Sequence, residues 1–436
     1  FNGWYNLTKE KFIKSTIILI IGGFITKVLG MVIKVINTRL IGLDGISLYM
    51  LIFPTFSLFM SLSQFSLPTS VSKLVSEDKY NNKNIVFSAI PIILIFDIVL
   101  VFIILLSAQF ISINLLKDSR CYLPILCISM VLPFEALSNM LRGYFFGKQK
   151  MFPHVVSHVI EQIVRLILTI IFIPTLIKID LVYAVSFLVL VNMISEFTSI
   201  VILLLFMPKK VKITKDDIKP QKENIKNILE ISIPNTNTRL IGNIGYFLEP
   251  ILLTAGLMKS GYSLSYITQE YGIIAGYSMP LLLLPGFFTG AVSNSLLPVI
   301  SKAHANKEYS YIKRKLKQAI TISLAIGLPV TIILFIFPEF FLKLIYGTTH
   351  GGTYLKALAI PFLFYYIELP FAACLQAISK SKDVMIDNII GIILKTILLY
   401  ILSLLHIGIY SFIIASSVNI IYVACNHYRH IKKALS

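Results

Sequence analysis

Basic side chains occur inside two long apolar segments, where a membrane would leave them without water. They form two stripes at helical spacing, Gly23, Lys27, Gly30 and Lys34 in the first segment and Asn235, Arg239, Gly242, Tyr246 and Glu249 in the second. Residues three or four apart share one face of a helix. A charge at the bilayer centre costs at least about 2.5–3.5 kcal/mol, so these cations must face protein or a water-filled cavity. The pattern predicts an anion-binding site built from Lys27, Lys34 and Arg239, with Asn235 and Tyr246 as polar neighbours.

Carboxylates in similar segments have two roles open to them. Glu249 precedes Pro250 within its apolar segment, and Asp97 lies inside another, so both are candidates for binding a coupling cation. A structural alternative is that Lys27 only pairs with a buried acid, Asp97 or Glu135, and holds helices together.

Other charged residues favour structural roles. Arg165 follows Glu161 by four residues, a spacing that predicts an ion pair along one helix. Several buried acids stay open between ion pairing and proton binding: Asp97, Glu135, Glu196, Glu368 and Asp387.

The elements that must position these side chains are membrane helices. The chain has 436 residues, of which 56% are hydrophobic and 14% charged, and its mean hydropathy is +0.82. Apolar runs of about 20 residues, the length that spans a bilayer, recur throughout, and helices satisfy their own backbone in lipid. The predicted fold class is an all-α polytopic membrane protein. About twelve spans are expected, at 12–36, 46–72, 85–110, 121–147, 154–176, 181–207, 228–257, 267–300, 317–337, 354–378, 384–405 and 408–428.

The distribution of Lys and Arg predicts the orientation. The net charge of +18 is concentrated in alternate breaks between the apolar runs, so it indicates membrane topology rather than nucleic-acid binding. One of these basic breaks follows the fourth span and is assigned Arg142, Lys148 and Lys150. Because cytoplasmic loops are basic, both termini are expected in the cytoplasm.

A long polar break divides the chain into two halves of six spans. The predicted domains are an N-lobe at 1–207, a cytoplasmic basic linker at 208–227 and a C-lobe at 228–436. Short stretches match between the halves: "TKVLG" (26–30) matches "TRLIG" (238–242), and "SLPTSVSKLVSEDKYNNK" (66–83) matches "SLLPVISKAHANKEYSYIK" (295–313). An internal repeat of this kind predicts two pseudo-symmetric six-helix lobes around a central cavity.

The sequence lacks the usual motifs for catalysis and metal binding, so it gives little support for an enzyme. The sequence lacks HExxH, a Walker lysine loop and GxSxG. His154, His158 and Glu161 have spacing that can hold a metal, but they open a span beside a basic loop, and no metal site is predicted. Four cysteines lack CxxC pairing and are interpreted as core residues. We therefore expect no catalytic residue and no cofactor, with coupling to Na⁺, H⁺ or the membrane potential left open.

Several stretches resemble a known family. "ITKVLGMVIKVINTRLIG", "SLSQFSLPTSVSKLVSE", "MLRGYFFGKQKMFP" and "QEYGIIAGYSMPLLLLPGFFTGAVSNSLLPVISKA" resemble the stage V sporulation protein B branch of the polysaccharide transporters. That branch belongs to the MOP flippase superfamily, with MurJ-type lipid II flippases and MATE exporters as relatives. The resemblance implies a bacterial cytoplasmic-membrane protein that flips undecaprenyl-linked glycans by alternating access.

The match to the MurJ-type pattern is partial. Lys27 matches the basic residue that precedes "VLG" in the first helix of that pattern. Ile33 and Lys34 stand where the pattern has an Arg-Asp pair, and Leu58 and Phe59 stand where it has paired arginines. These departures weaken the prediction of lipid II as the cargo.

The expected function is a lipid-linked oligosaccharide flippase that moves lipid II or a related glycan. Its partners would be the anionic glycan lipid, membrane lipids and the cell-wall synthesis machinery, without nucleic acid. The alternatives are a MATE-like cation-coupled drug exporter and a non-transporting membrane scaffold.

Overall fold

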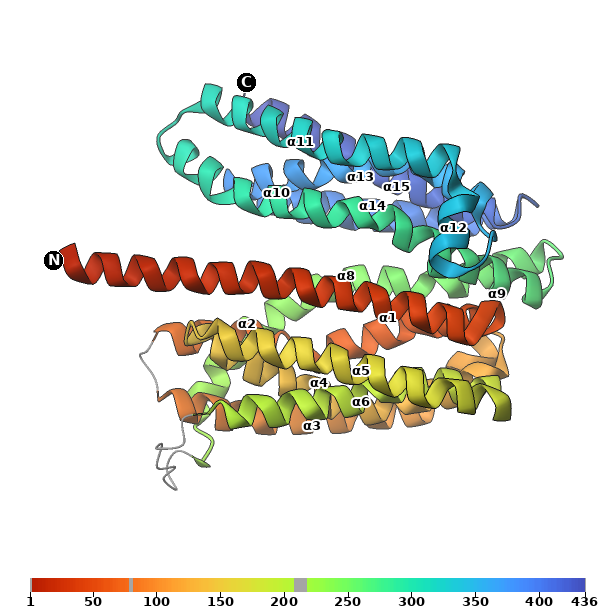
Figure 1. The fold of residues 1–436 in the computed structure, drawn as a ribbon, viewed down its shortest axis with the longest axis horizontal. Helices are drawn as coiled ribbons and strands as arrows, with labels where there is room; N and C mark the ends of the chain where they lie inside the picture. The colour runs from red at the N-terminus through yellow and green to blue at the C-terminus, as the bar shows by residue number, and fades with distance from the viewer. Residues whose placement is uncertain (1, 78–80, 208–217, 436) are drawn as a thin grey trace. The chain divides into compact units, whose positions relative to one another are not determined.

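The computed structural model describes residues 2–77, 81–207 and 218–435, and no β-strand occurs among them (Figure 1). Ten helices in this part of the chain are long and apolar enough to cross a membrane. The predicted all-α polytopic fold is confirmed. The longer helices before residue 208 are α1 (Asn2–Gln64), α2 (Leu67–Glu77), α3 (Asn82–Gln109), α4 (Tyr122–Gly147), α5 (Met151–Ile179) and α6 (Leu181–Leu205).

The second half of the chain repeats this arrangement of long helices. They are α8 (Lys222–Lys259), α9 (Leu264–Ile273), α10 (Met279–Ala305), α11 (Tyr309–Ile336), α12 (Pro338–Tyr346), α13 (Gly352–Ala377), α14 (Ser381–Ser403) and α15 (Tyr410–Leu435). Short π-helical turns extend α3 at Phe110–Leu115 and precede α10 at Ile274–Ser278, and a 3₁₀ turn at Ser119–Cys121 precedes α4.

The chain forms two compact units. Unit 1 comprises Phe1–Gly45 and Ile52–Asn243, and unit 2 comprises Ile46–Leu51 and Ile244–Ser436. The units differ from the predicted lobes at 46–51 and at 228–243. The division into lobes at 1–207 and 228–436 with a cytoplasmic linker at 208–227 stays a prediction, and residues 208–217 of that linker lie outside the described part of the chain.

The two units have the same internal packing order. In unit 1, α4 packs against α2, α3 and α6, and α6 packs against α5. In unit 2, α13 packs against α10, α11 and α15, and α15 packs against α14. Each unit also has an apolar cluster between equivalent helices, around Leu67, Ile85 and Met140 in unit 1 and around Ile300, Ile312 and Cys374 in unit 2. The repeated packing agrees with the predicted pseudo-symmetry, while the cavity between the lobes stays a prediction.

The first helix contains two of the predicted spans. It continues through Gly42, whose φ of 67° and ψ of −169° place a kink between them. A positive φ is strained for residues with a Cβ and accessible to glycine. The predicted second span, 46–72, is wrong at its end, because Phe65 and Ser66 adopt φ of 44° and 49° and separate α1 from α2. The count of twelve spans stays a prediction, since α15 is not among the ten apolar helices.

The helices expose apolar side chains and bury polar ones, which is the reverse of the distribution in a soluble protein. On α3, the apolar side chains of Ile95 and Leu106 are 66% and 82% exposed, while Asp97 is 2% exposed. Exposed apolar residues of this kind face lipid when a helix spans a bilayer, and the acid must then face the protein interior. The interior of each unit is therefore where polar chemistry is concentrated.

Close packing between α2 and α4 depends on a glycine. A Cβ at Gly143 would lie 2.6 Å from the carbonyl oxygen of Pro68 and 2.8 Å from its Cα, so a side chain there would push the two backbones apart. Gly290 on α10 offers a comparison, because a Cβ there would meet nothing within 4 Å.

We predict that Gly143→Ala lowers the stability of the purified protein and that Gly290→Ala does not. Overpacking of this kind costs about 1–3 kcal/mol, while alanine in a helix gains up to about 1 kcal/mol over glycine. Thermal unfolding in detergent measures both effects. Equal unfolding midpoints for the two variants would contradict the close contact.

Candidate functional site

The predicted substrate-binding residues lie on α1 and α8. Lys27, Asn235 and Arg239 are exposed, and Lys34 is half-buried. All four belong to unit 1. Tyr246 is half-buried on the part of α8 that belongs to unit 2. The joint role of these residues in binding a substrate stays a prediction.

Lys27 does not pair with the acids that the structural alternative offered. Asp97 accepts a hydrogen bond from Ser63 Oγ at 2.7 Å. Glu135 accepts from Gln64 Nε2 at 2.8 Å and from Asn139 Nδ2 at 2.7 Å. In residues 2–77, 81–207 and 218–435, the ammonium of Lys27 has neither of these carboxylates as an ion-pair partner, so pairing with Asp97 or Glu135 is wrong.

The two predicted coupling acids have different surroundings. Asp97 is buried, and its second oxygen, Oδ2, has no hydrogen-bond partner among the described residues. Glu249 is buried in unit 2, where it forms an ion pair with Lys395 of α14. The Lys395 ammonium also lies 5.1 Å from the ring centroid of Phe412 on α15. A coupling cation at Glu249 would have to displace this ammonium, and the coupling role of both acids stays a prediction.

A polar network in unit 1 centres on Arg142, which the sequence did not mark as a buried residue. Arg142 was assigned to a cytoplasmic loop, and this is wrong: it lies within α4 and is 3% exposed. Its Nη2 donates to Glu161 Oε2 at 2.6 Å on α5, and to Glu196 Oε2 at 3.0 Å and Ser199 Oγ at 2.7 Å on α6. One guanidinium therefore ties three helices of unit 1 together.

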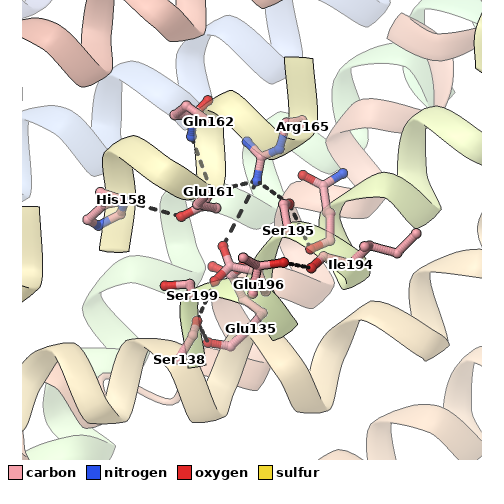
Figure 2. A network of polar contacts seen from close by, with 12 residues as sticks. Glu135, Ser138, His158, Glu161, Gln162, Arg165, Ile194, Ser195, Glu196 and Ser199 are labelled. Atoms are coloured by element: carbon pink, nitrogen blue, oxygen red, sulfur yellow. Dashed lines mark hydrogen bonds and ion pairs between the residues drawn. The ribbon is translucent and has the colours of Figure 1, made fainter. Parts of the chain in front are cut away.

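The network extends along α5 and α6 (Figure 2). Arg165 Nη2 donates to Glu161 Oε1 at 2.7 Å, so the predicted intrahelical ion pair is confirmed. His158 Nδ1 lies 3.3 Å from Glu161 Oε2, and Ser138 Oγ donates to Glu196. The two buried glutamates are thus surrounded by basic and hydroxyl groups, which is the arrangement that makes buried charge tolerable.

Unit 2 carries a polar cluster between the equivalent helices α13, α14 and α15. His427 is fully buried, with Nδ1 3.0 Å from Glu368 Oε1 and Nε2 3.8 Å from Asp387 Oδ2. His430 Nε2 lies 3.4 Å from the same Asp387 oxygen. Glu368 and Asp387 therefore contact histidines. His427 was not predicted from the sequence, because it lies beside a basic tail.

Metal-ligand groupings do not occur in the part of the chain that the structure describes: it brings together no three His, Cys, Asp or Glu side chains as a metal site would require. Of the spaced trio His154, His158 and Glu161, the last two form the ion pair given above. The chemistry of the buried residues is that of charge neutralisation within a membrane.

These features define a multi-pass membrane protein made of two repeated helical units. The family described as "Polysaccharide biosynthesis protein" matches residues 12–304, and the family MatE matches residues 249–401. Stage V sporulation protein B of Bacillus subtilis (strain 168) is 36% identical over 411 residues, covering 91% of this chain and 79% of that protein. The chain belongs to the polysaccharide biosynthesis protein family.

Two further comparisons concern a second relative and a solved structure. Lipid II flippase MurJ of Bacillus subtilis (strain 168) is 24% identical over 425 residues, covering 89% of this chain and 77% of that protein. The inward-facing structure of a multidrug resistance MATE family transporter of the MOP superfamily has a TM-score of 0.76 at 16% identity, covering 94% of each chain. The chain therefore has the fold of this transporter.

We predict that Arg142→Met destabilises the protein by about 3–5 kcal/mol, because it leaves Glu161 and Glu196 buried without their shared cation. Lys150→Met, at an exposed position beyond the same helix, should leave stability unchanged. Unfolding of both variants in the same detergent is the measurement. A loss of similar size in the two variants would show that the network contributes no more than a surface charge.

The Glu249–Lys395 pair is expected to behave as a coupled unit. Lys395→Met leaves a buried carboxylate unpaired and should cost about 3–5 kcal/mol, whereas adding Glu249→Gln removes that penalty and should restore most of the stability. A double-mutant cycle on thermal unfolding measures the coupling. Additive losses would mean that the two side chains do not interact.

Proposed function

We propose that the chain is a flippase for a lipid-linked oligosaccharide. Its favoured cargo is undecaprenyl-pyrophosphate-linked peptidoglycan precursor, lipid II, or a related glycan. It would work by alternating access in the bacterial cytoplasmic membrane, with both termini in the cytoplasm. The partners of the protein would be the anionic glycan lipid, the membrane lipids and the cell-wall synthesis machinery.

One observation carries this proposal: the membrane helices α1 and α8 have exposed cations, while the buried cations Arg142 and Lys395 are paired with glutamates. Lys27 and Arg239 are exposed, and neither forms an ion pair within the described residues. Arg142 and Lys395 each contact a glutamate. A cation without a carboxylate is costly in lipid, so it needs water or an anionic ligand. A pyrophosphate is such a ligand, and its oxygens match the donors of lysine and arginine.

The comparisons support the same class of cargo without fixing it. The family description concerns polysaccharide biosynthesis, and the MurJ relative is named a lipid II flippase. Neither the flippase nor the MATE transporter carries the name of an enzyme, in keeping with a protein that moves its substrate without changing it.

A cation-coupled drug exporter is the second candidate, and the MatE match over 249–401 favours it. A binding site for cationic drugs needs carboxylates that are free to meet the ligand. Glu161 and Glu196 are already held by Arg142, and Glu249 is held by Lys395. Among the described residues, Asp97 and Asp387 each have a buried oxygen without a hydrogen bond. Asp387 lies beside His427 and His430.

Reconstitution in liposomes tests the proposal. The rate at which lipid II, and separately a simpler polyprenyl-pyrophosphate glycan, becomes accessible to an external reagent is measured with and without protein. We predict that Lys27→Gln and Arg239→Gln each lower this rate about tenfold or more, the effect of losing one hydrogen bond to a charged group. Lys356→Gln, an exposed lysine outside both stripes, is the matched control and should keep the rate.

Two other results would contradict the proposal. Unchanged rates in the Lys27→Gln, Arg239→Gln double variant would exclude these cations from transport. Failure of well-folded wild-type protein to expose either lipid, together with export of a cationic dye, would replace the flippase with the exporter.

A further inference from the structure

Unit 1 contains a pocket of about 510 Å³ at the end that carries Lys73, Lys148 and Lys150. It is lined by α2, α4 and the start of α5. The stretch 66–77 that supplies its α2 wall is part of the sequence that matches 295–313 in the second half, and neither of the cationic stripes reaches it. Its chemistry is therefore separate from that of Lys27 and Arg239.

Two helices present polar stripes to this pocket. From α2 come Thr69, Ser72, Lys73 and Ser76, which are spaced by three, one and three residues and so share one face. The opposite face of the same helix is apolar and buried, with Leu67, Val71, Leu74 and Val75 in the core. The amphipathic pattern holds the hydroxyls and the ammonium of α2 on the pocket side.

Helix α4 contributes the facing stripe with the same spacing. Its members are Asn139, Arg142, Gly143 and Phe146. The absent side chain of Gly143 lets α4 approach the backbone of Pro68 closely, so the floor of the pocket is narrow. Phe146 supplies an apolar wall that is 45% exposed.

The charge of the lining is one-sided. Its charged residues are Lys73 and Arg142, His154 adds a neutral imidazole, and none of the ten lining residues is an acid. The acids nearest to Arg142, namely Glu161 and Glu196, bind its Nη2 and are not part of the lining. Lys73 is exposed, and its ammonium forms no ion pair within the part of the chain that the structure describes.

Two nitrogens of the lining residues lack partners. Arg142 Nε and His154 Nδ1 are both buried and have no hydrogen bond within residues 2–77, 81–207 and 218–435. Arg142 itself is only 3% exposed. A buried donor without a partner costs about 1–3 kcal/mol, so such groups normally have a ligand or water. Although Arg142 Nη2 binds two glutamates, its Nε has no partner among the described residues, and together with the Lys73 ammonium and the hydroxyls of α2 it offers donors suited to a phosphate.

We infer that this pocket is a binding site for the phosphate group of an anionic membrane lipid. The apolar walls of Pro68 and Phe146 fit the adjoining glycerol and acyl carbons, while Lys73 at the rim and Arg142 at the back bind the phosphate oxygens. The basic end of unit 1 is where the anionic inner leaflet would meet the protein if both termini are cytoplasmic. The site lies outside the proposed cargo stripes, and lipid binding here does not require that the chain flips any glycan.

Native mass spectrometry of the purified full-length chain tests the inference. The probes are phosphatidylglycerol, phosphatidylcholine as a zwitterionic comparison whose choline offsets the phosphate charge, and inorganic phosphate as a competitor. We expect Lys73→Gln, which removes the rim charge, to weaken binding of the first phosphatidylglycerol about tenfold. Ser76→Trp, which fills the pocket from an exposed position, should do the same. Lys302→Gln is the matched control, because Lys302 occupies the repeat-related position in "LPVISK" and lies outside the pocket.

The competitor identifies the source of the phosphate. Displacement of the lipid by inorganic phosphate supports a site that recognises the phosphate alone. Lack of displacement supports a site that also binds the acyl chains. Equal phosphatidylglycerol affinity in wild type, Lys73→Gln and Ser76→Trp would overturn the inference. So would an equal loss in Lys302→Gln, which would show a general charge effect. Thermal unfolding of each variant confirms that the exposed substitutions leave the fold intact.

Discussion

The cost of an unpaired charge in a bilayer is the constraint on which the rest of the structure depends. A lone charge at membrane depth costs at least about 2.5–3.5 kcal/mol, and this protein retains many basic residues within its apolar helices. Most buried ones are neutralised inside a single unit: Arg142 and Arg165 by Glu161, and Lys395 by Glu249. These pairs fix neighbouring helices against one another. Lys27 and Arg239 lie exposed instead, and they are the cations available to a ligand.

Because of the internal repeat, each unit has its own buried polar cluster between three equivalent helices. In unit 1 the helices α4, α5 and α6 meet around Arg142, and in unit 2 the helices α13, α14 and α15 meet around His427. The positions of the acids are similar, since Glu135 and Glu368 lie on the equivalent helices α4 and α13. The basic partners differ, because arginine holds a permanent charge and histidine does not. The repeat has kept the location of the polar core while its chemistry has changed.

Hydropathy and short-range spacing were sufficient to predict much of the fold. They predicted the helical membrane class and the Glu161–Arg165 pair, because each depends on residues that are close in sequence, and matching stretches in the two halves predicted the repeat. Arg142 could not be recognised in this way. It lies near Lys148 and Lys150, as a loop residue would, and its partners come from α5 and α6 at 19 and 54 residues away. His427 could not be recognised for the same reason, because it lies beside Arg429. The break at Phe65 and Ser66 could not be predicted, because it involves residues of no special composition.

The most direct test of the account is the equilibrium binding of a short-chain polyprenyl pyrophosphate to the purified protein and to the Lys27→Gln, Arg239→Gln double variant. The account predicts that the wild-type chain binds the pyrophosphate and that binding weakens as salt is raised. It also predicts that the double variant loses most of this affinity with an unchanged unfolding midpoint, since neither cation holds a carboxylate in the described chain. Equal affinity in the two proteins would contradict the claim that the exposed cations of α1 and α8 bind the cargo.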